Sequence, residues 1–302
     1  MQTVQNFKNA IKTKHVRVGI IGLGYVGLPL AVEFAKKGIR TIGIDVNADK
    51  VKLVNAGKSY IPDVSAKDMA AAVKKRLLSA TSNYSKLKEV DVVIVCVPTP
   101  LNRVKEPDLS FILEATAAIA KHLHKGELVV LESTTYPGTT DEVILPKLSA
   151  SGLKVGRDFF LSFSPERIDP GNKKFPVSSI PKVVGGITAT CGELAALLYG
   201  QIFSQVVKVS SARTAEMAKL LENTFRIVNI GLVNELATIA GALDVDIWEA
   251  IDAAKTKPFG YMPFYPGPGV GGHCIGIDPI YLAWKAKTHG FNIRRFNGRC
   301  RN

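Results

Sequence analysis

A glycine-rich turn at residues 22–27, with the sequence GLGYVG, has the spacing of a dinucleotide-binding motif. It follows an apolar run at 16–21 that predicts a buried strand, and it precedes a helical pattern. In this context Gly22 permits the tight turn, Gly24 lets the backbone approach a pyrophosphate, and Gly27 lets helix and strand pack closely. Free N–H groups at the start of the helix would face the phosphates. The predicted cofactor-binding residues of the turn are Gly22, Gly24, Tyr25, Val26 and Gly27.

An acidic residue follows at the distance that such folds use for ribose recognition. Asp45 lies 23 residues after Gly22, at the end of the strand predicted at 41–46. A carboxylate there would accept hydrogen bonds from the adenosine ribose and would repel a 2′-phosphate. The spacing therefore predicts NAD rather than NADP; a glycine turn beside an unrelated surface aspartate is the alternative.

Two threonines follow the next predicted strands in the chain. Thr99 comes after the apolar run at 90–97, and Thr134 comes after the run at 128–131. Because ligands of doubly wound sheets bind at the carboxyl ends of the strands, we predict that both threonines contact the nicotinamide half of the cofactor. Capping of a turn is the alternative role for each.

A cysteine stands among glycines near the end of the chain. Cys274 lies within GVGGHCIG at 269–276, where the missing side chains let backbone and ligand come close. We predict a nucleophile there, in contrast to Cys96, which lies inside the apolar sequence VIVCV. No CxxC pair or Cys/His cluster occurs, so neither a metal site nor a disulfide framework is expected among Cys96, Cys191, Cys274 and Cys300.

Three further polar residues are candidates for catalysis. Lys219 and Asn223 are four positions apart in a long helical pattern and share one face of it. Glu166 follows the strand predicted at 159–163 and is a candidate general base. Spacing alone favours a solvated helix face for Lys219 and Asn223 and a surface ion pair for Glu166.

The elements that must position these residues alternate between strand and helix as far as residue 207. This alternation predicts a parallel sheet covered by helices. The predicted strands are 16–21, 41–46, 90–97, 128–131, 159–163, 182–184 and 206–209. The predicted helices between them are 28–37, 49–55, 66–79, 110–120 and 190–198.

The pattern changes near residue 210. Residues 212–243 are helical with few breakers, a second helix is predicted at 245–254, and a Gly/Pro-rich loop follows at 257–279. The predicted fold is therefore α/β, with a Rossmann-like doubly wound parallel sheet followed by an all-α region. The predicted domains are 1–208, 209–290 and an Arg-rich, acid-free tail at 291–302.

Composition and charge limit the possible partners. The chain has 302 residues, 46% of them apolar, as expected of a globular protein with a sizeable core. Six of its thirteen excess positive charges lie after Asp278, and the remainder suits anionic small molecules better than nucleic acid. No apolar run is long enough to span a bilayer, and the N-terminus has no signal-peptide core. We therefore expect a cytoplasmic protein with no membrane or nucleic-acid partner.

Six motifs in order resemble the nucleotide-sugar 6-dehydrogenase family, which includes UDP-glucose and GDP-mannose dehydrogenases. The resemblance runs from about residue 16 to 290, through the motifs GIIGLGYVGLPLA, VIVCVPTPL, ESTTYPGTT, SPERIDPGN, AEMAKLLENTFR and GPGVGGHCIGIDP. It implies oxidation of a sugar C6 alcohol to a carboxylate by two NAD, serving surface polysaccharide synthesis. It also implies a homodimer that forms through the long helix.

The resemblance assigns roles to the candidate residues. Cys274 matches the cysteine that forms a thiohemiacetal and then a thioester with the substrate. Lys219 and Asn223 would stabilise the oxyanion, and Asp278 would hold a water molecule with Lys219. Glu166 matches the base for thioester hydrolysis, and Thr134 matches a residue near the reacting centre.

The motifs STTYPGTT and FSPERIDPGN are most similar to those of enzymes that act on UDP-N-acetylglucosamine. UDP-N-acetylmannosamine and UDP-glucose dehydrogenases are the nearest alternatives. An inactive remnant that binds NAD and dimerises is another, as is a hydroxyacid dehydrogenase of the 6-phosphogluconate or 3-hydroxyisobutyrate type. Members of the resembled family carry a third, UDP-binding domain after this region, and we expect it to be missing here, with 291–302 a product of a frameshift or premature end.

Overall fold

The computed structural model describes residues 4–167, 179–269 and 273–291. The chain divides into two compact units. The first comprises Met1–Pro100 and Asp108–Lys219, and the second comprises Leu101–Pro107 and Leu220–Asn302. The division falls inside a long helix, and the domain boundary that the sequence places at 208 stays a prediction.

The first unit is built on one eight-stranded sheet with the order β3-β2-β1-β4-β5-β6-β7-β8. All neighbouring strands are parallel except β6 and β7, which are antiparallel. This arrangement confirms the predicted α/β doubly wound class, with one reversal that the sequence did not indicate. The strands are β1 (Arg17–Ile21), β2 (Arg40–Ile44), β3 (Leu78–Thr81), β4 (Val92–Val95), β5 (Leu128–Leu131), β6 (Phe160–Phe163), β7 (Lys182–Gly186) and β8 (Val206–Val209).

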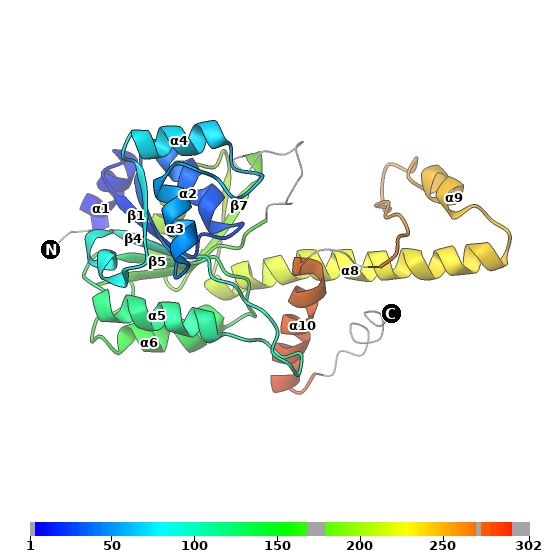
Figure 1. Ribbon diagram of the computed structural model, residues 1–302. Helices are drawn as coiled ribbons and strands as arrows, with labels where there is room; N and C mark the ends of the chain where they lie inside the picture. The colour runs from blue at the N-terminus through cyan, green and yellow to red at the C-terminus, as the bar shows by residue number, and fades with distance from the viewer. Residues whose placement is uncertain (1–3, 168–178, 270–272, 292–302) are drawn as a thin grey trace. The chain divides into compact units, whose positions relative to one another are not determined.

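Helices cover both faces of this sheet (Figure 1). Alternate side chains of the central strands point to opposite faces, so every residue of β4 is buried. Helices α2 and α7 contribute to the core on one face, and α5 and α6 contribute to the core on the other. The helices of this unit are α1 (Val4–Lys12), α2 (Gly27–Lys36), α3 (Ala48–Asn55), α4 (Ala66–Lys74), α5 (Ser110–His122), α6 (Leu145–Ser149) and α7 (Ala189–Tyr199), with the 3₁₀-helix η1 (Tyr84–Glu89) and the π-helix η2 (Thr139–Ile144).

The helix predicted at 66–79 is wrong at its C-terminal end, where the structure has strand β3. Helix α4 ends after Lys74, and Arg76 takes a left-handed backbone conformation with φ of 55°. The turn redirects the chain so that residues 78–81 pair with β2. Buried and outward side chains then alternate along β3, a pattern too short to be separated from the preceding helix by periodicity.

Helix α1 is a second element that the sequence did not indicate. Five of its nine residues are polar, but Phe7 and Ile11 lie one turn apart and are fully buried. The ring of Phe7 stacks on that of Phe160 in β6, with centroids 6.3 Å apart. The N-terminal segment is therefore part of the core of this unit.

The second unit is mainly helical and contains most of α8 (Ala212–Ala242), together with α9 (Ile247–Ala254) and α10 (His273–Thr288). The predicted long helix is present and continuous. The loop predicted at 257–279 is too long, because α10 already begins at His273, where the glycine run ends and an apolar pattern resumes. Among the described residues, no helix combines the length and the apolarity needed to cross a bilayer.

Candidate functional site

The glycine-rich turn joins β1 to α2 and has the shape that a pyrophosphate requires. Gly22 has φ of +91°, and a Cβ atom there would lie 2.5 Å from the carbonyl oxygen of Cys96. A Cβ atom on Gly27 would lie 1.9 Å from the carbonyl oxygen of Gly22. A Cβ atom on Gly24 would meet nothing within 4 Å, and no side chain caps the N-terminus of α2. The turn therefore leaves open space in front of a helix N-terminus, as phosphate binding needs.

Asp45 is fixed against this turn at the end of β2. It is buried, its Oδ2 accepts a hydrogen bond from Leu23 N at 2.8 Å, and its Oδ1 accepts one from Asn47 N at 2.9 Å. Each carboxylate oxygen can accept a further bond, so the group suits a ribose diol. Lys50 Nζ lies 3.6 Å from Oδ2 and balances part of the charge.

Tyr60 supports the same turn and was not predicted from the sequence. Its hydroxyl donates a 2.6 Å hydrogen bond to the carbonyl of Leu23. Burial, together with the nearby charge of Asp45, raises the pKa of Tyr60 well above its usual value, so the hydroxyl stays protonated and remains a donor. Its place in a loop between α3 and α4 gave no signal of this contact.

The two predicted threonines lie at the carboxyl edge of the sheet. Thr99 follows β4, Thr134 follows β5, and both are half-buried. Ser133 connects the two loops, because its Oγ donates a 2.8 Å hydrogen bond to the carbonyl of Val97. Both threonines therefore stand on braced backbone at the edge where ligands bind, and their contacts with a nicotinamide stay predictions.

Lys219 lies in the first unit and is buried, which rules out the solvated face that spacing alone allowed. Its Nζ donates a 2.5 Å hydrogen bond to the backbone carbonyl of Glu166. This bond connects α8 to the segment that follows β6. The side chain of Glu166 is 13% exposed and lies 3.5 Å from the buried Lys182, so its ion pair is not at the surface, as the alternative assumed.

Asn223 and Asp278 meet in the second unit. Both are buried, and Asn223 Nδ2 donates a hydrogen bond to Asp278 Oδ2. Asp278 stands on α10, one helical turn after Cys274. The side chain of Cys274 lies outside the described part of the structure, and its predicted role as nucleophile stays a prediction.

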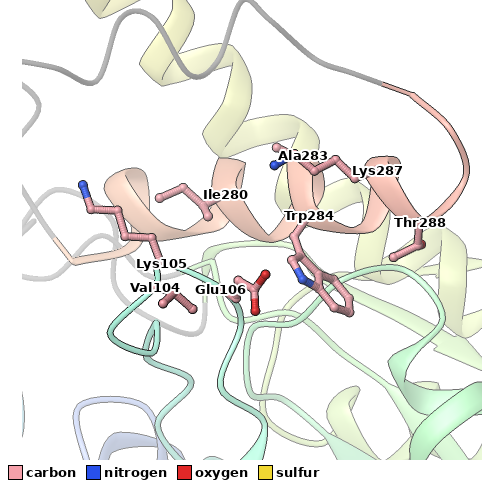
Figure 2. Close-up of a pocket in the computed structure, with 8 residues that line it drawn as sticks. All are labelled: Val104, Lys105, Glu106, Ile280, Ala283, Trp284, Lys287 and Thr288. Carbon is pink, nitrogen blue, oxygen red and sulfur yellow. The ribbon is translucent and has the colours of Figure 1, made fainter.

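A separate cavity of about 480 Å³ lies in the second unit, between the 101–107 segment and α10 (Figure 2). The indole of Trp284 extends from α10 toward the segment that carries Glu106. None of the predicted site residues lines this cavity. Within the described ranges, no group of three His, Cys, Asp or Glu side chains is arranged to hold a metal ion.

Comparison with known families accounts for both units. Residues 16–203 match the NAD binding domain of the UDP-glucose/GDP-mannose dehydrogenase family, and residues 213–298 match its central domain. The chain belongs to the UDP-glucose/GDP-mannose dehydrogenase family. The predicted resemblance and the NAD-binding character of the first unit are thereby confirmed, and the hydroxyacid dehydrogenase alternative loses its support.

Individual members of the UDP-glucose/GDP-mannose dehydrogenase family are similar over most of this chain. The UDP-N-acetyl-D-glucosamine 6-dehydrogenase of Pseudomonas aeruginosa is 46% identical over 282 residues, which are 92% of this chain and 65% of the relative. The corresponding enzyme of Salmonella typhi is 43% identical over 91% of this chain and 64% of its own length. The solved UDP-D-ManNAc dehydrogenase of Pyrococcus horikoshii has a TM-score of 0.86 and 35% identity, covering 93% of this chain and 66% of that one. The chain thus spans about 65% of the length of these curated relatives.

Proposed function

We propose that the protein is an NAD-dependent nucleotide-sugar 6-dehydrogenase that oxidises the C6 alcohol of a UDP-N-acetylhexosamine to a carboxylate. The observation that carries the proposal is the buried hydrogen bond between Asn223 and Asp278. It fixes a candidate oxyanion donor to the helix on which Cys274 stands one turn earlier. Two relatives named as UDP-N-acetyl-D-glucosamine 6-dehydrogenases support UDP-N-acetylglucosamine as the substrate.

The proposed chemistry uses Cys274 as a covalent catalyst. The glycine turn and Asp45 would hold two NAD molecules in turn, and each would supply an acceptor for one hydride. After the alcohol has lost its first hydride and its hydroxyl proton, the Cys274 thiolate forms a C–S bond with the C6 aldehyde, and loss of the second hydride from the resulting alkoxide leaves a thioester. Water then attacks the thioester carbonyl while Glu166 takes the water proton, and the C–S bond breaks to release the carboxylate and the thiolate.

Lys219 and Asn223 are proposed to stabilise the oxyanion that develops at C6. Removal of one such donor typically lowers kcat about 10²–10³-fold. Asp278 receives the hydrogen bond of Asn223 and so orients its amide, and with Lys219 it is proposed to hold a water molecule. Thr134 and Thr99 are proposed to contact the nicotinamide half of the cofactor.

We further propose that the active form is a homodimer joined through α8. Five large apolar side chains of this helix, and Leu243 directly after its end, are 44–68% exposed and fall within about 60° of each other when placed around an ideal helix. Such a stripe, with spacing close to a heptad, is typical of a helix that packs against a partner helix. The stripe consists of Leu221, Phe225, Leu232, Leu236, Ile239 and Leu243.

An NADH absorbance assay with UDP-N-acetylglucosamine, UDP-N-acetylmannosamine and UDP-glucose tests the activity and the choice of sugar. The proposal expects two NADH per carboxylate formed, with UDP-N-acetylglucosamine preferred, and loss of turnover in Cys274→Ala with NAD binding intact. NAD binding without NADH formation from any of the three sugars would instead identify an inactive, cofactor-binding remnant. A role in surface polysaccharide synthesis and a cytoplasmic location stay predictions from the sequence.

A further inference from the structure

A buried ion network lies at the carboxyl edge of the sheet, within the first unit. Lys182 Nζ lies 2.9 Å from Glu132 Oε2 and 3.5 Å from Glu166 Oε2. Tyr199 donates a hydrogen bond through its hydroxyl to Glu132 Oε1. The side chain of Lys182 is 2% exposed and that of Glu132 is fully buried. No part of this network except Glu166 was a predicted site residue.

The reversed strand explains why a lysine at the start of β7 reaches this edge. Because β7 runs antiparallel to β6, its first residue lies at the end of the sheet where β5 and β6 finish. Glu132 directly follows β5, and Glu166 follows β6. The three charged residues, far apart in the chain, therefore meet where ligands of doubly wound sheets bind.

Lys182 is charged in this environment. Burial lowers its pKa, but the carboxylates of Glu132 and Glu166 raise it by more, and the net shift is upward. The rings of Tyr199 and Phe203 also face the ammonium, with centroids 5.2 and 5.4 Å from Nζ. A buried ammonium with these partners has a fixed position.

The two carboxylates differ in what surrounds them. Glu132 is enclosed, and Lys182 and Tyr199 each bind one of its oxygens. Glu166 is partly exposed, and its Oε1 accepts a 2.6 Å hydrogen bond from Arg167 N. Glu132 therefore serves as the anchor of Lys182, and Glu166 is the member of the network that a substrate or water molecule can reach.

We infer that Lys182 is a positioning residue, which holds the carboxylate of Glu166 in one orientation while Glu132 and Tyr199 hold Lys182 itself. The inference rests on the proposed function, in which Glu166 is the base for thioester hydrolysis. A base must lie within hydrogen-bond distance of the proton that it removes, and a displacement of about 1 Å can lower the reaction rate about 10²-fold. Lys182 would thus act on the last chemical step and on neither hydride transfer.

Three variants and a control separate positioning from folding. Lys182→Met alone leaves Glu132 buried without its cation, and that variant is at risk of not folding. The double variant Glu132→Gln/Lys182→Met removes both charges of the buried pair and keeps its shape, and Lys182→Arg keeps the cation. Lys8→Met is the control, because Lys8 forms a 2.9 Å ion pair with Glu193 near the surface of the same unit.

The first measurement is amide hydrogen exchange at Arg167, which needs no substrate. The inference expects at least tenfold faster exchange at this amide in the folded double variant, because Glu166 Oε1 no longer stays in place. Lys182→Arg should remain closer to the wild type, and Lys8→Met should match it. Unchanged exchange at Arg167 in a folded double variant would overturn the inference.

The second measurement is the time course of NADH formation with UDP-N-acetylglucosamine and the mass of the intact protein. The double variant should form its first NADH within twofold of the wild-type rate, then turn over at least tenfold more slowly, with acylated protein accumulating. Equal slowing of both phases would overturn the positioning role. A wild-type chain that forms no NADH from any nucleotide sugar contradicts the proposed function instead, and exchange at Arg167 then decides the role of Lys182 alone.

Discussion

Asn223 of α8 and Asp278 of α10 are joined by a hydrogen bond between two buried side chains. Asn223 thus donates to the carboxyl group of Asp278 away from water. Loss of the donor would leave part of that buried carboxyl group without its hydrogen bond, which lowers stability.

Asn223→Ala should therefore lower the free energy of unfolding by about 1–3 kcal/mol, and Asn223→Asp should lower it further, because two carboxylates would then face each other. Urea unfolding at a fixed protein concentration measures both. Asn229→Ala is the control, since Asn229 donates a solvent-exposed hydrogen bond to the Phe225 carbonyl on the same helix. An Asp variant as stable as the Ala variant would contradict the expected contact.

The glycines of the turn should separate folding from cofactor binding. Gly27→Ala places Cβ against the Gly22 carbonyl and should lower the free energy of unfolding by about 1–3 kcal/mol or more. Gly24→Val meets open space, so it should leave the melting temperature nearly unchanged and abolish NAD binding measured by calorimetry. Normal NAD affinity in Gly24→Val would show that the pyrophosphate lies elsewhere.

Asp45→Asn tests the predicted preference for NAD. The amide keeps an acceptor for Leu23 N but removes the charge that would repel a 2′-phosphate, beside Lys50. We expect the ratio of NADP to NAD affinity to rise about tenfold, which corresponds to about 1.4 kcal/mol. Asp49→Asn makes the same change in net charge at an exposed position nearby and should leave the ratio unaltered.

Glu127 should make stability fall as pH rises. Burial raises the pKa of Glu127 to about 7. His124 lowers this pKa by less than burial raises it, and the negative charge of Asp91 raises it further. The folded state therefore keeps a proton that the unfolded state has lost, and stability declines from the unfolded pKa near 4.5 up to about pH 7. The difference between the folded and unfolded pKa values of Glu127 sets an upper bound of about 3 kcal/mol on this loss of stability.

Chemical denaturation between pH 4 and 8 measures the slope. Glu127→Gln removes one titrating group and should reduce the slope, while Glu216, whose pKa burial also raises to about 7, should keep its own part of it. A variant with the same slope as the wild type would assign the effect to other groups.

The apolar stripe of α8 predicts the oligomeric state. Leu236→Lys/Ile239→Lys places charge in the middle of the stripe and should convert a dimer into a monomer by light scattering. Thr238→Lys is the control, because Thr238 is exposed and faces away from the stripe. A wild-type monomer would contradict the proposed dimer directly.

Sequence patterns predicted the parts of the fold in which local signal and burial agree. The apolar runs of β1, β4 and β5 and the breaker-poor pattern of α8 are present as expected. The four residues of β3 were misassigned because only pairing with β2 distinguishes them from the end of a helix. The start of α10 at His273 was missed because glycines dominate the sequence just before it.

The candidate site was predictable only where a motif carries its own geometry. The positions of Gly22, Gly27 and Asp45 follow from the strand–turn–helix unit. The contact of Lys182 with Glu132 does not, because it joins residues 50 positions apart and depends on the reversed strand. Long-range pairing of this kind has no counterpart in local periodicity.

The open space at Gly24 has a consequence for how such a chain would change over generations. Gly22 and Gly27 are required by the fold, because any side chain there would clash with backbone atoms. Gly24 has no such neighbour and is required only by a ligand that approaches the turn. A lineage that stopped using its dinucleotide would keep the outer two glycines and lose the middle one to drift. A glycine at position 24 is therefore explained by a bound ligand rather than by the stability of the polypeptide.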